Sequence, residues 1–239
     1  MGYSRNKMVK KPILLLFGAS SGIATKLIKF FKKDNAVFAF YNNNAIPANF
    51  EIKKIKLNLL NDKEIFLTLS KFKKKKSKII IINFASVKND ELSAFIRNEN
   101  LNKTFQVNTF SFLKIIQTLL PSMIKNKWGR VINISSTGGL VGDRGTLLYT
   151  ASKNASLSMM KVMSQEYANF NITFNTLLLG NFNFGMFKRL NKKTKDKILK
   201  KIPSKKTGKI INIYNAIKFL ITSDYVNGAS IKIDGGYPD

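Results

Sequence analysis

The chain has 239 residues, a length that suits a single α/β domain with a sizeable core. It contains neither histidine nor cysteine, which excludes Ser-His-Asp triads, cysteine nucleophiles, disulfides and the common zinc and iron–sulfur sites. Its 41 basic and 13 acidic residues give a net charge of +28, which indicates either a polyanionic partner or compositional drift toward Lys, Asn, Ile and Phe.

Seven short apolar segments alternate with longer amphipathic ones. The short segments are rich in Ile, Val, Leu and Phe without strict alternation, as expected of parallel strands covered on both faces. We predict strands at residues 13–17, 36–41, 52–57, 79–84, 131–135, 172–178 and 230–233. We predict helices at residues 22–31, 62–71, 100–125, 148–169 and 211–222. This order predicts one α/β domain over residues 1–239, a doubly wound parallel sheet of about seven strands with helices on both faces.

Two connections depart from the regular pattern. Ten residues, including Pro47, separate the second and third predicted strands, whereas a parallel crossover normally needs about a dozen. We therefore expect the helix there to be lost or reduced to a turn. Residues 181–209 form a lysine-rich, irregular stretch after a strand end, where loops border the ligand in α/β sheets. This position predicts a substrate lid.

No apolar run approaches the roughly 18–20 residues that a membrane span needs. The first eleven residues are polar and basic, with no apolar signal core behind them. We therefore expect a soluble, cytoplasmic protein with no membrane partner.

A glycine-rich loop follows the first predicted strand and opens the first predicted helix. Gly18 and Gly22 allow the backbone to turn sharply and approach a pyrophosphate, and a helix amino terminus presents free N–H groups to it. Ser20 and Ser21 add hydroxyl donors. Strand, glycine loop and helix together predict a dinucleotide site.

The end of the second strand contacts the adenosine ribose in such folds, and an acid there repels a 2′-phosphate. Here the strand ends in Tyr41 and Asn42, with neither an acid nor an arginine. This pattern favours NADPH as the cofactor, with NADH as the alternative.

The spacing Y-x-x-x-K occurs three times, beginning at Tyr3, Tyr149 and Tyr214. Only Tyr149 has a serine thirteen residues earlier, Ser136, at the end of a predicted strand. Tyr149 and Lys153 are four apart and therefore share one face of a helix. Because a neighbouring ammonium stabilises a phenolate and lowers its pKa, Tyr149 is a candidate acid, while Ser136 hydrogen-bonds the substrate carbonyl.

With these motifs the chain resembles the short-chain dehydrogenase/reductase family from about residue 13 to residue 236. The matching residues are Gly18-Ala-Ser-Ser-Gly22-Ile23, Asn108, Asn133-Ile-Ser-Ser136, Tyr149-Thr-Ala-Ser-Lys153 and Ile233-Asp-Gly-Gly236. The resemblance implies a Rossmann-like fold without a metal, in which Lys153 also binds the nicotinamide ribose and Asn108 holds a water of a proton relay. The implied catalytic residues are Asn108, Ser136, Tyr149 and Lys153. The implied cofactor contacts are Gly18, Ser20, Ser21, Gly22, Ile23, Tyr41, Asn42, Asn58, Leu59, Asn83, Ala85, Tyr149, Lys153, Gly180 and Phe182.

Several cofactor positions depart from the family pattern. This chain has Ala24 where the family has the third loop glycine, and Asn58 where it has an acid near the end of the third strand. It has Phe184 where a threonine often follows the sixth strand. The Asn-Asn-Ala-Gly motif appears as Asn83-Phe84-Ala85-Ser86, and the Pro-Gly motif as Leu179-Gly180. The four catalytic positions are unaffected.

The segment Lys201-Ile-Pro-Ser-Lys-Lys-Thr-Gly208 and the overall spacing are most similar to 3-oxoacyl-acyl-carrier-protein reductases. The resemblance implies an NADPH-dependent ketoreductase, a homotetramer or dimer, that acts on a 3-oxoacyl thioester in fatty acid biosynthesis. A sugar or other small metabolite of surface-polysaccharide or secondary metabolism is the alternative substrate. A non-enzymatic cofactor sensor or polyanion-binding protein is the alternative of another class, and a nucleic-acid partner is not expected.

If the positive charge serves an acidic carrier protein, lysines at the mouth of the site should contact it. The candidates are Lys127, Lys188, Lys192 and Lys193. By resemblance, carrier-dependent reductases use a basic residue near Lys127 and often a second one where this chain has Phe170.

Overall fold

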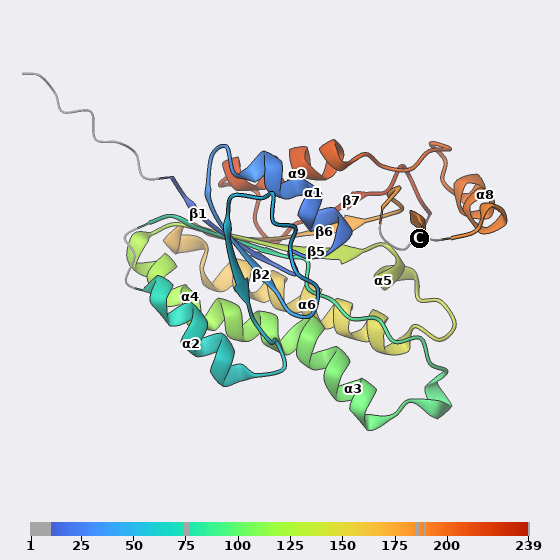
Figure 1. The fold of residues 1–239 in the computed structure, drawn as a ribbon, viewed down its shortest axis with the longest axis horizontal. Coiled ribbons are helices and arrows are strands. Elements are labelled where there is room, and N and C mark those ends of the chain that lie inside the picture. The colour runs from blue at the N-terminus through green and yellow to red at the C-terminus, as the bar shows by residue number, and fades with distance from the viewer. Residues whose placement is uncertain (1–10, 74–76, 185–186, 189, 239) are drawn as a thin grey trace, which may run out of the picture.

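The computed structural model describes residues 11–73, 77–184, 187–188 and 190–238. Within them, seven parallel strands form one sheet in the order β3-β2-β1-β4-β5-β6-β7 (Figure 1). The strands are β1 (Ile13–Phe17), β2 (Ala36–Tyr41), β3 (Lys53–Lys56), β4 (Ile79–Asn83), β5 (Gly129–Ser136), β6 (Ile172–Leu179) and β7 (Ser230–Ile233). The main helices are α1 (Gly22–Phe31), α2 (Asp62–Lys73), α3 (Asn98–Phe105), α4 (Ser111–Asn126), α6 (Leu147–Glu166), α8 (Lys192–Lys201) and α9 (Ile210–Thr222). The predicted fold class is confirmed.

Helices cover both faces of the sheet and enclose two apolar layers. α1 and α9 lie on one face, and α2, α4 and α6 lie on the other (Figure 1). All five residues of β1 are buried: Leu14 and Leu16 join the first layer, whereas Leu15 and Phe17 join the second. Burial on both faces explains why the strand sequences are apolar throughout rather than alternating.

The connection between β2 and β3 contains no helix, as its short length predicted. Residues 42–52 form bends, a turn and irregular backbone, and β3 begins at Lys53. The ammonium of Lys54 holds the connection by donating to the C=O of Pro47 at 2.7 Å and to that of Ala48 at 3.2 Å. The chain therefore passes directly from one strand to the next at this edge of the sheet.

The helix predicted at residues 100–125 contains a π-helical turn. α3 continues into this turn, η2 (Gln106–Phe110), and then into α4. The N–H of Ser111 donates to the C=O of Gln106, five residues earlier, so one extra residue is accommodated in the turn. Such turns occur frequently at functional sites, and this one carries Asn108.

The segment predicted to be irregular, residues 181–209, contains helix α8, so that prediction was wrong in part. Asn191 caps the helix by accepting a hydrogen bond from the N–H of Thr194 at 2.9 Å. None of the residues of α8 is buried, and its sequence therefore lacks the apolar stripe that identifies most helices. A short helix, α5 (Gly138–Val141), was also not predicted. The role of the segment as a lid stays a prediction.

Among the described helices, none is both long and apolar enough to cross a membrane. The described part of the chain likewise contains no group of three or more acidic side chains placed to hold a metal ion. The pair Tyr3 and Lys7 lies outside the described residues, as do residues 74–76 of the lysine run that begins at Lys73.

Arg130 is buried at the beginning of β5 and connects three parts of the fold. Its Nε donates to the C=O of Ile221 at 3.1 Å, near the end of α9. Its guanidinium also donates to the C=O of Asn171 at 3.0 Å and lies 4.6 Å from the centre of the Trp128 ring. The side chain thus supplies donors to carbonyl groups that water reaches poorly.

We expect Arg130→Met to lower the free energy of unfolding by about 2–4 kcal/mol, measured by urea denaturation, because these carbonyls lose their donors. Arg97→Met is the matched control. It removes an exposed ion pair with Glu91 and should change the free energy by less than about 0.5 kcal/mol. Equal effects of the two substitutions would contradict the structural role of Arg130.

Candidate active site

The four expected catalytic residues lie at the carboxyl side of the central strands. Ser136 ends β5, and Tyr149 and Lys153 lie one turn apart on α6. Tyr149 forms a side-chain hydrogen bond with Ser136, and the Lys153 ammonium lies 5.8 Å from the centre of the Tyr149 ring. The fourth residue, Asn108, reaches α6 from the η2 turn. The fold therefore brings together residues that are up to 45 positions apart in the chain.

Tyr149 and Ser136 form the part of the site that could face a substrate. Burial raises the pKa of the Tyr149 phenol, and the hydrogen bond with Ser136 lowers it only in part. The pKa of Tyr149 is therefore raised, whereas the sequence led us to expect that Lys153 would lower it. The expectation was wrong because residue spacing does not reveal how far a side chain is removed from water. A protonated phenol at neutral pH is suited to donate a proton.

Lys153 is almost completely buried, with 3% of its surface exposed. Burial lowers the pKa of its ammonium to about 8, because removal from water disfavours the charged form. Its Nζ donates to the C=O of Ile134 on β5 at 3.3 Å. The aliphatic part of the side chain packs under Gly139, where an added Cβ would come within 3.2 Å of the Lys153 Cβ. These contacts fix the position of Lys153, one helical turn after Tyr149 on α6.

Asn108 ties the loop after β4 to α6. Its Nδ2 donates to the C=O of Val87 and to the Oγ of Ser152, both at 2.9 Å, and its Oδ1 accepts from the N–H of Val87 at 2.8 Å. Ser152 in turn donates to the C=O of Tyr149 at 2.9 Å. The Asn108 side chain is therefore engaged within the protein, and its predicted role in a water-mediated relay stays a prediction.

A second buried polar chain connects β4, β5 and α6. The Nδ2 of Asn83 donates to Asn133 Oδ1 at 3.3 Å, and the Nδ2 of Asn133 donates to Ser156 Oγ at 3.1 Å. Asn83 also accepts from the N–H of Ala85 at 3.1 Å, which fixes the backbone after β4. Ser152 and Ser156 were not predicted from the sequence, although their spacing from Tyr149 and Lys153 on one helix places them on its buried side.

A cavity of about 300 Å³ lies at the carboxyl ends of β1 to β4. It is lined by seven of the expected cofactor contacts, Gly18, Ser20, Tyr41, Asn42, Asn58, Leu59 and Ala85. Asn43, Asn44, Ser86, Val87, Lys103 and Val107 also line it, although none of them was predicted. Gly18 has a φ of 68°, and an added Cβ would lie 2.5 Å from the N of Ala85, so the loop and the β4 end approach closely only because residue 18 is glycine.

The first turn of α1 lies beside this cavity and fits the diphosphate of a dinucleotide. Ser21 is the N-cap, and its Oγ accepts a hydrogen bond from the N–H of Ala24 at 3.3 Å. Gly22 and Ile23 begin the helix, where the first N–H groups have no partner within the helix and the dipole is positive. An anionic diphosphate complements both features.

The two remaining cofactor candidates lie after β6 and are tightly packed. A Cβ at Gly180 would fall 2.6 Å from the Cα of Asp234, so this glycine allows the end of β6 to approach the end of β7. Phe182 is 4% exposed and its ring covers Gly208, whose N–H donates to the C=O of Asn181 at 3.0 Å. Neither residue lines the 300 Å³ cavity, and their contacts with a cofactor stay predictions.

The third Y-x-x-x-K copy lies elsewhere in the fold. Tyr214 belongs to α9, and its ring stacks on Phe30 of α1 with centroids 4.9 Å apart. It also contacts Phe31 at 5.7 Å. Tyr214 therefore packs two helices together and is separate from the Ser136–Tyr149 pair.

A doubly wound parallel sheet with a glycine loop and a serine–tyrosine–lysine cluster defines the class of dinucleotide-dependent oxidoreductases. Similarity to known proteins supports this assignment. The family model "short chain dehydrogenase" matches residues 12–195. The 3-oxoacyl-acyl-carrier-protein reductase of Buchnera aphidicola subsp. Schizaphis graminum is 30% identical over 95% of this chain and 98% of its own length.

Two solved structures share the fold. A structure titled "ElxO with NADP Bound" has a TM-score of 0.84 at 23% identity and covers 95% of this chain and 98% of its own. A putative gluconate dehydrogenase from Agrobacterium tumefaciens has a TM-score of 0.85 at 19% identity and covers 96% of both chains. The chain belongs to the short-chain dehydrogenase family. It is an oxidoreductase that acts on alcohol or carbonyl groups with a nicotinamide dinucleotide.

Proposed function

We propose that the protein is an NADPH-dependent ketoreductase that acts on a 3-oxoacyl thioester. The observation that carries the proposal is the contact of Tyr149 with Ser136 close to buried Lys153, in a fold that also has a cavity of about 300 Å³ at the carboxyl ends of β1 to β4. The similarity to the Buchnera 3-oxoacyl-acyl-carrier-protein reductase supports the substrate class. An NADP-bound structure among the fold relatives supports the cofactor.

In this proposal the nicotinamide supplies a hydride when it is bound, and the chain supplies the proton and the alignment. Ser136 donates a hydrogen bond to the substrate carbonyl oxygen, and Tyr149 donates its phenolic proton to the same oxygen as charge develops there. Lys153 stabilises the resulting phenolate when its ammonium is charged. Asn108 positions the backbone of α6 at Tyr149 through Ser152.

The proposed substrate is tested by NADPH oxidation with acetoacetyl thioesters, measured against a panel of sugars and small keto acids. The proposal requires the thioester to have the highest kcat/KM. A sugar with a higher value would support the second candidate, a sugar or small-metabolite dehydrogenase, which the fold likeness to a putative gluconate dehydrogenase favours. No turnover with any compound would favour a cofactor-sensing protein.

We expect Asn42→Asp to shift the preference of the enzyme from NADPH toward NADH. Asn42 lines the cavity at the end of β2, where a carboxylate would repel a 2′-phosphate and accept a hydrogen bond from a free 2′-hydroxyl. The ratio of the two kcat/KM values should fall by about tenfold or more. Wild-type kinetics that favour NADH would overturn the proposed cofactor.

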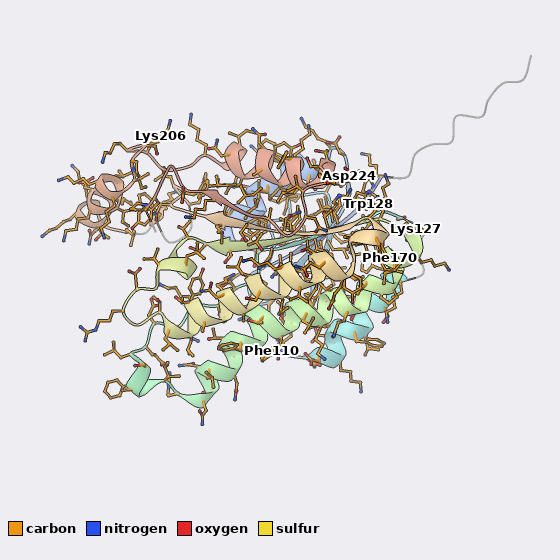
Figure 2. All side chains as sticks on the ribbon, turned by 180° about the vertical axis from the view of Figure 1, so that it is seen from behind. Phe110, Lys127, Trp128, Phe170, Lys206 and Asp224 are labelled. Atoms are coloured by element: carbon orange, nitrogen blue, oxygen red, sulfur yellow. The ribbon has the colours of Figure 1, made fainter. Side chains whose placement is uncertain are left out.

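We propose a homo-oligomer in which α4 and α6 form an interface. Large apolar side chains of α6 and of η2, the turn that leads into α4, are about half exposed: Phe110 at 48%, Leu147 at 50% and Val162 at 55%. Figure 2 shows Phe110 on the outer side of the helical layer. Light scattering of the purified protein would distinguish a monomer from a dimer or tetramer.

The candidate carrier contacts do not lie together in one chain. Lys127 precedes β5, at the amino end of the strands, whereas Ser136 ends the same strand roughly 25 Å away by strand geometry. Figure 2 shows Lys127, Trp128 and Phe170 at the end of the molecule opposite Lys206 of the proposed lid. Lys127 is therefore not a lysine of its own chain's active-site mouth, which corrects the expectation from the sequence.

We expect charge reversal at Lys188, Lys192 or Lys193 to raise KM for a carrier-bound thioester about three- to tenfold. A small thioester should be almost unaffected, because it lacks the acidic carrier. The effect should fade with salt, since the Debye length is about 8 Å at physiological ionic strength.

Lys73→Glu, at the far end of α2, is the control for these reversals. A similar KM increase for Lys73→Glu would show that the lid is not the docking surface and would assign the charge to compositional drift. A KM increase confined to Lys127→Glu would instead locate docking on a neighbouring subunit.

A further inference from the structure

The cavity at the ends of β1 to β4 has an uneven distribution of charge. Its lining consists of apolar and neutral polar residues with one exception, Lys103. No carboxylate lines it in the described structure. Two acids lie behind its wall, and both accept hydrogen bonds there: Asp62 from Gln106 at 2.8 Å and Glu64 from the N–H of Asn58 at 2.9 Å.

Lys103 reaches the cavity from the helical side, opposite the strand ends. It lies on α3 four residues before Val107, and this spacing places both residues on the same face of the helical arm, where both line the cavity. Gln106, between them, fixes this arm to the wall after β3 by donating to Asp62 and, at 3.4 Å, to the C=O of Leu59. The base of Lys103 is thus held in place, while its side chain is exposed and free to extend.

The strand side of the cavity offers hydrogen-bond donors but no positive charge. Asn42, Asn43 and Asn44 follow β2, and Ser20 belongs to the glycine loop. A 2′-phosphate carries about two negative charges, which neutral amides and hydroxyls stabilise less well than an ammonium does. In a cavity of about 300 Å³, a flexible lysine side chain on one wall is within reach of a nucleotide bound against the other.

We propose that Lys103 is a specificity-determining residue that selects the 2′-phosphorylated dinucleotide. The proposal rests on the NADPH preference proposed above and names the positive charge responsible for it. Lys103 was not among the residues expected from the sequence, because it is 61 positions away from Asn42 and lies on a helix rather than in a strand-end loop.

The test is calorimetric binding of adenosine 2′,5′-bisphosphate and of adenosine 5′-monophosphate, which differ only in the 2′-phosphate. Wild-type protein should bind the bisphosphate more tightly. Lys103→Gln should reduce this preference about five- to tenfold, and Lys103→Glu should reduce it further. The loss should shrink as salt is added. The ratio of kcat/KM for NADPH and NADH should change in parallel.

Lys125→Gln, on α4 beyond the cavity lining, is the matched control and should leave the preference unchanged. If Lys103→Gln weakens both ligands equally, or neither, Lys103 does not read the 2′-phosphate and the inference is overturned, while NADPH preference stands. If wild-type protein does not prefer the bisphosphate, the proposed cofactor and the inference both fail.

Discussion

Tyr149→Phe should lower kcat for carbonyl reduction by about 10²- to 10⁴-fold. The phenol is the proton donor in the proposed reaction, and its raised pKa keeps it protonated at neutral pH. Phenylalanine retains the ring that packs near Lys153, so the fold and cofactor binding should be unchanged. The measurement is single-turnover reduction at saturating cofactor, together with cofactor affinity by fluorescence.

Tyr214→Phe is the control, because this tyrosine has the same spacing to a lysine but packs between α1 and α9. It should keep nearly full activity. A Tyr149→Phe enzyme with more than about a tenth of the wild-type rate would remove Tyr149 from the chemistry. A large loss in both variants would indicate a general sensitivity to aromatic substitution instead.

Lys153→Met should abolish most of the activity and yet raise the stability of the protein at neutral pH. The Lys153 ammonium is buried, and its Nζ donates a hydrogen bond to the C=O of Ile134. The fall of its pKa from 10.5 to about 8 corresponds to roughly 3 kcal/mol that disfavours the charged form in the folded protein. A methionine of similar length carries no charge and removes this cost of burial. We therefore expect the free energy of unfolding to rise by about 1–3 kcal/mol at pH 7.

The contribution of Lys153 to the free energy of unfolding depends on pH. Between about pH 8 and 10.5 the unfolded chain holds the Lys153 proton and the folded chain does not, so wild-type stability gains from this group as pH rises through that window. The advantage of Lys153→Met should therefore shrink above pH 8. Wild-type kcat/KM for reduction should also fall above about pH 8, because the free enzyme loses the ammonium that stabilises the phenolate.

Lys114→Met, at an exposed position of α4, is the control and should leave both stability and activity nearly unchanged. Destabilisation of the protein by Lys153→Met at pH 7 would show that the lysine contributes to the fold rather than being retained for catalysis.

The spacing of residues was enough to predict the fold and the proximity of Ser136, Tyr149 and Lys153 within it. Parallel strands buried on both faces have a distinctive apolar sequence, and their carboxyl ends meet at one edge, so Gly18, Tyr41 and Ser136 could be placed there. Tyr149 and Lys153 followed from helical periodicity. These features depend on local sequence and on topology, which the order of elements determines.

Features that depend on burial or on long-range packing could not be predicted. The direction of the Tyr149 pKa shift follows from desolvation, which no spacing reports. Ser152, which accepts a hydrogen bond from Asn108, is 44 residues away in the chain, and the two meet because η2 packs against α6. Lys127 lies only nine residues before Ser136, yet the two lie at opposite ends of β5, Lys127 near its amino end and Ser136 at its carboxyl end. Sequence proximity was misleading there.

The most direct test of the proposed reaction is hydride transfer itself. NADPH labelled with deuterium at C4, as each of its two epimers, is incubated with a 3-oxoacyl thioester, and the product is analysed by mass spectrometry. We predict deuterium on the hydroxyl-bearing C3 of a 3-hydroxyacyl product from one epimer only, with little product from Tyr149→Phe. Bound NADPH that transfers deuterium to no 3-oxoacyl thioester from either epimer would contradict the proposed function.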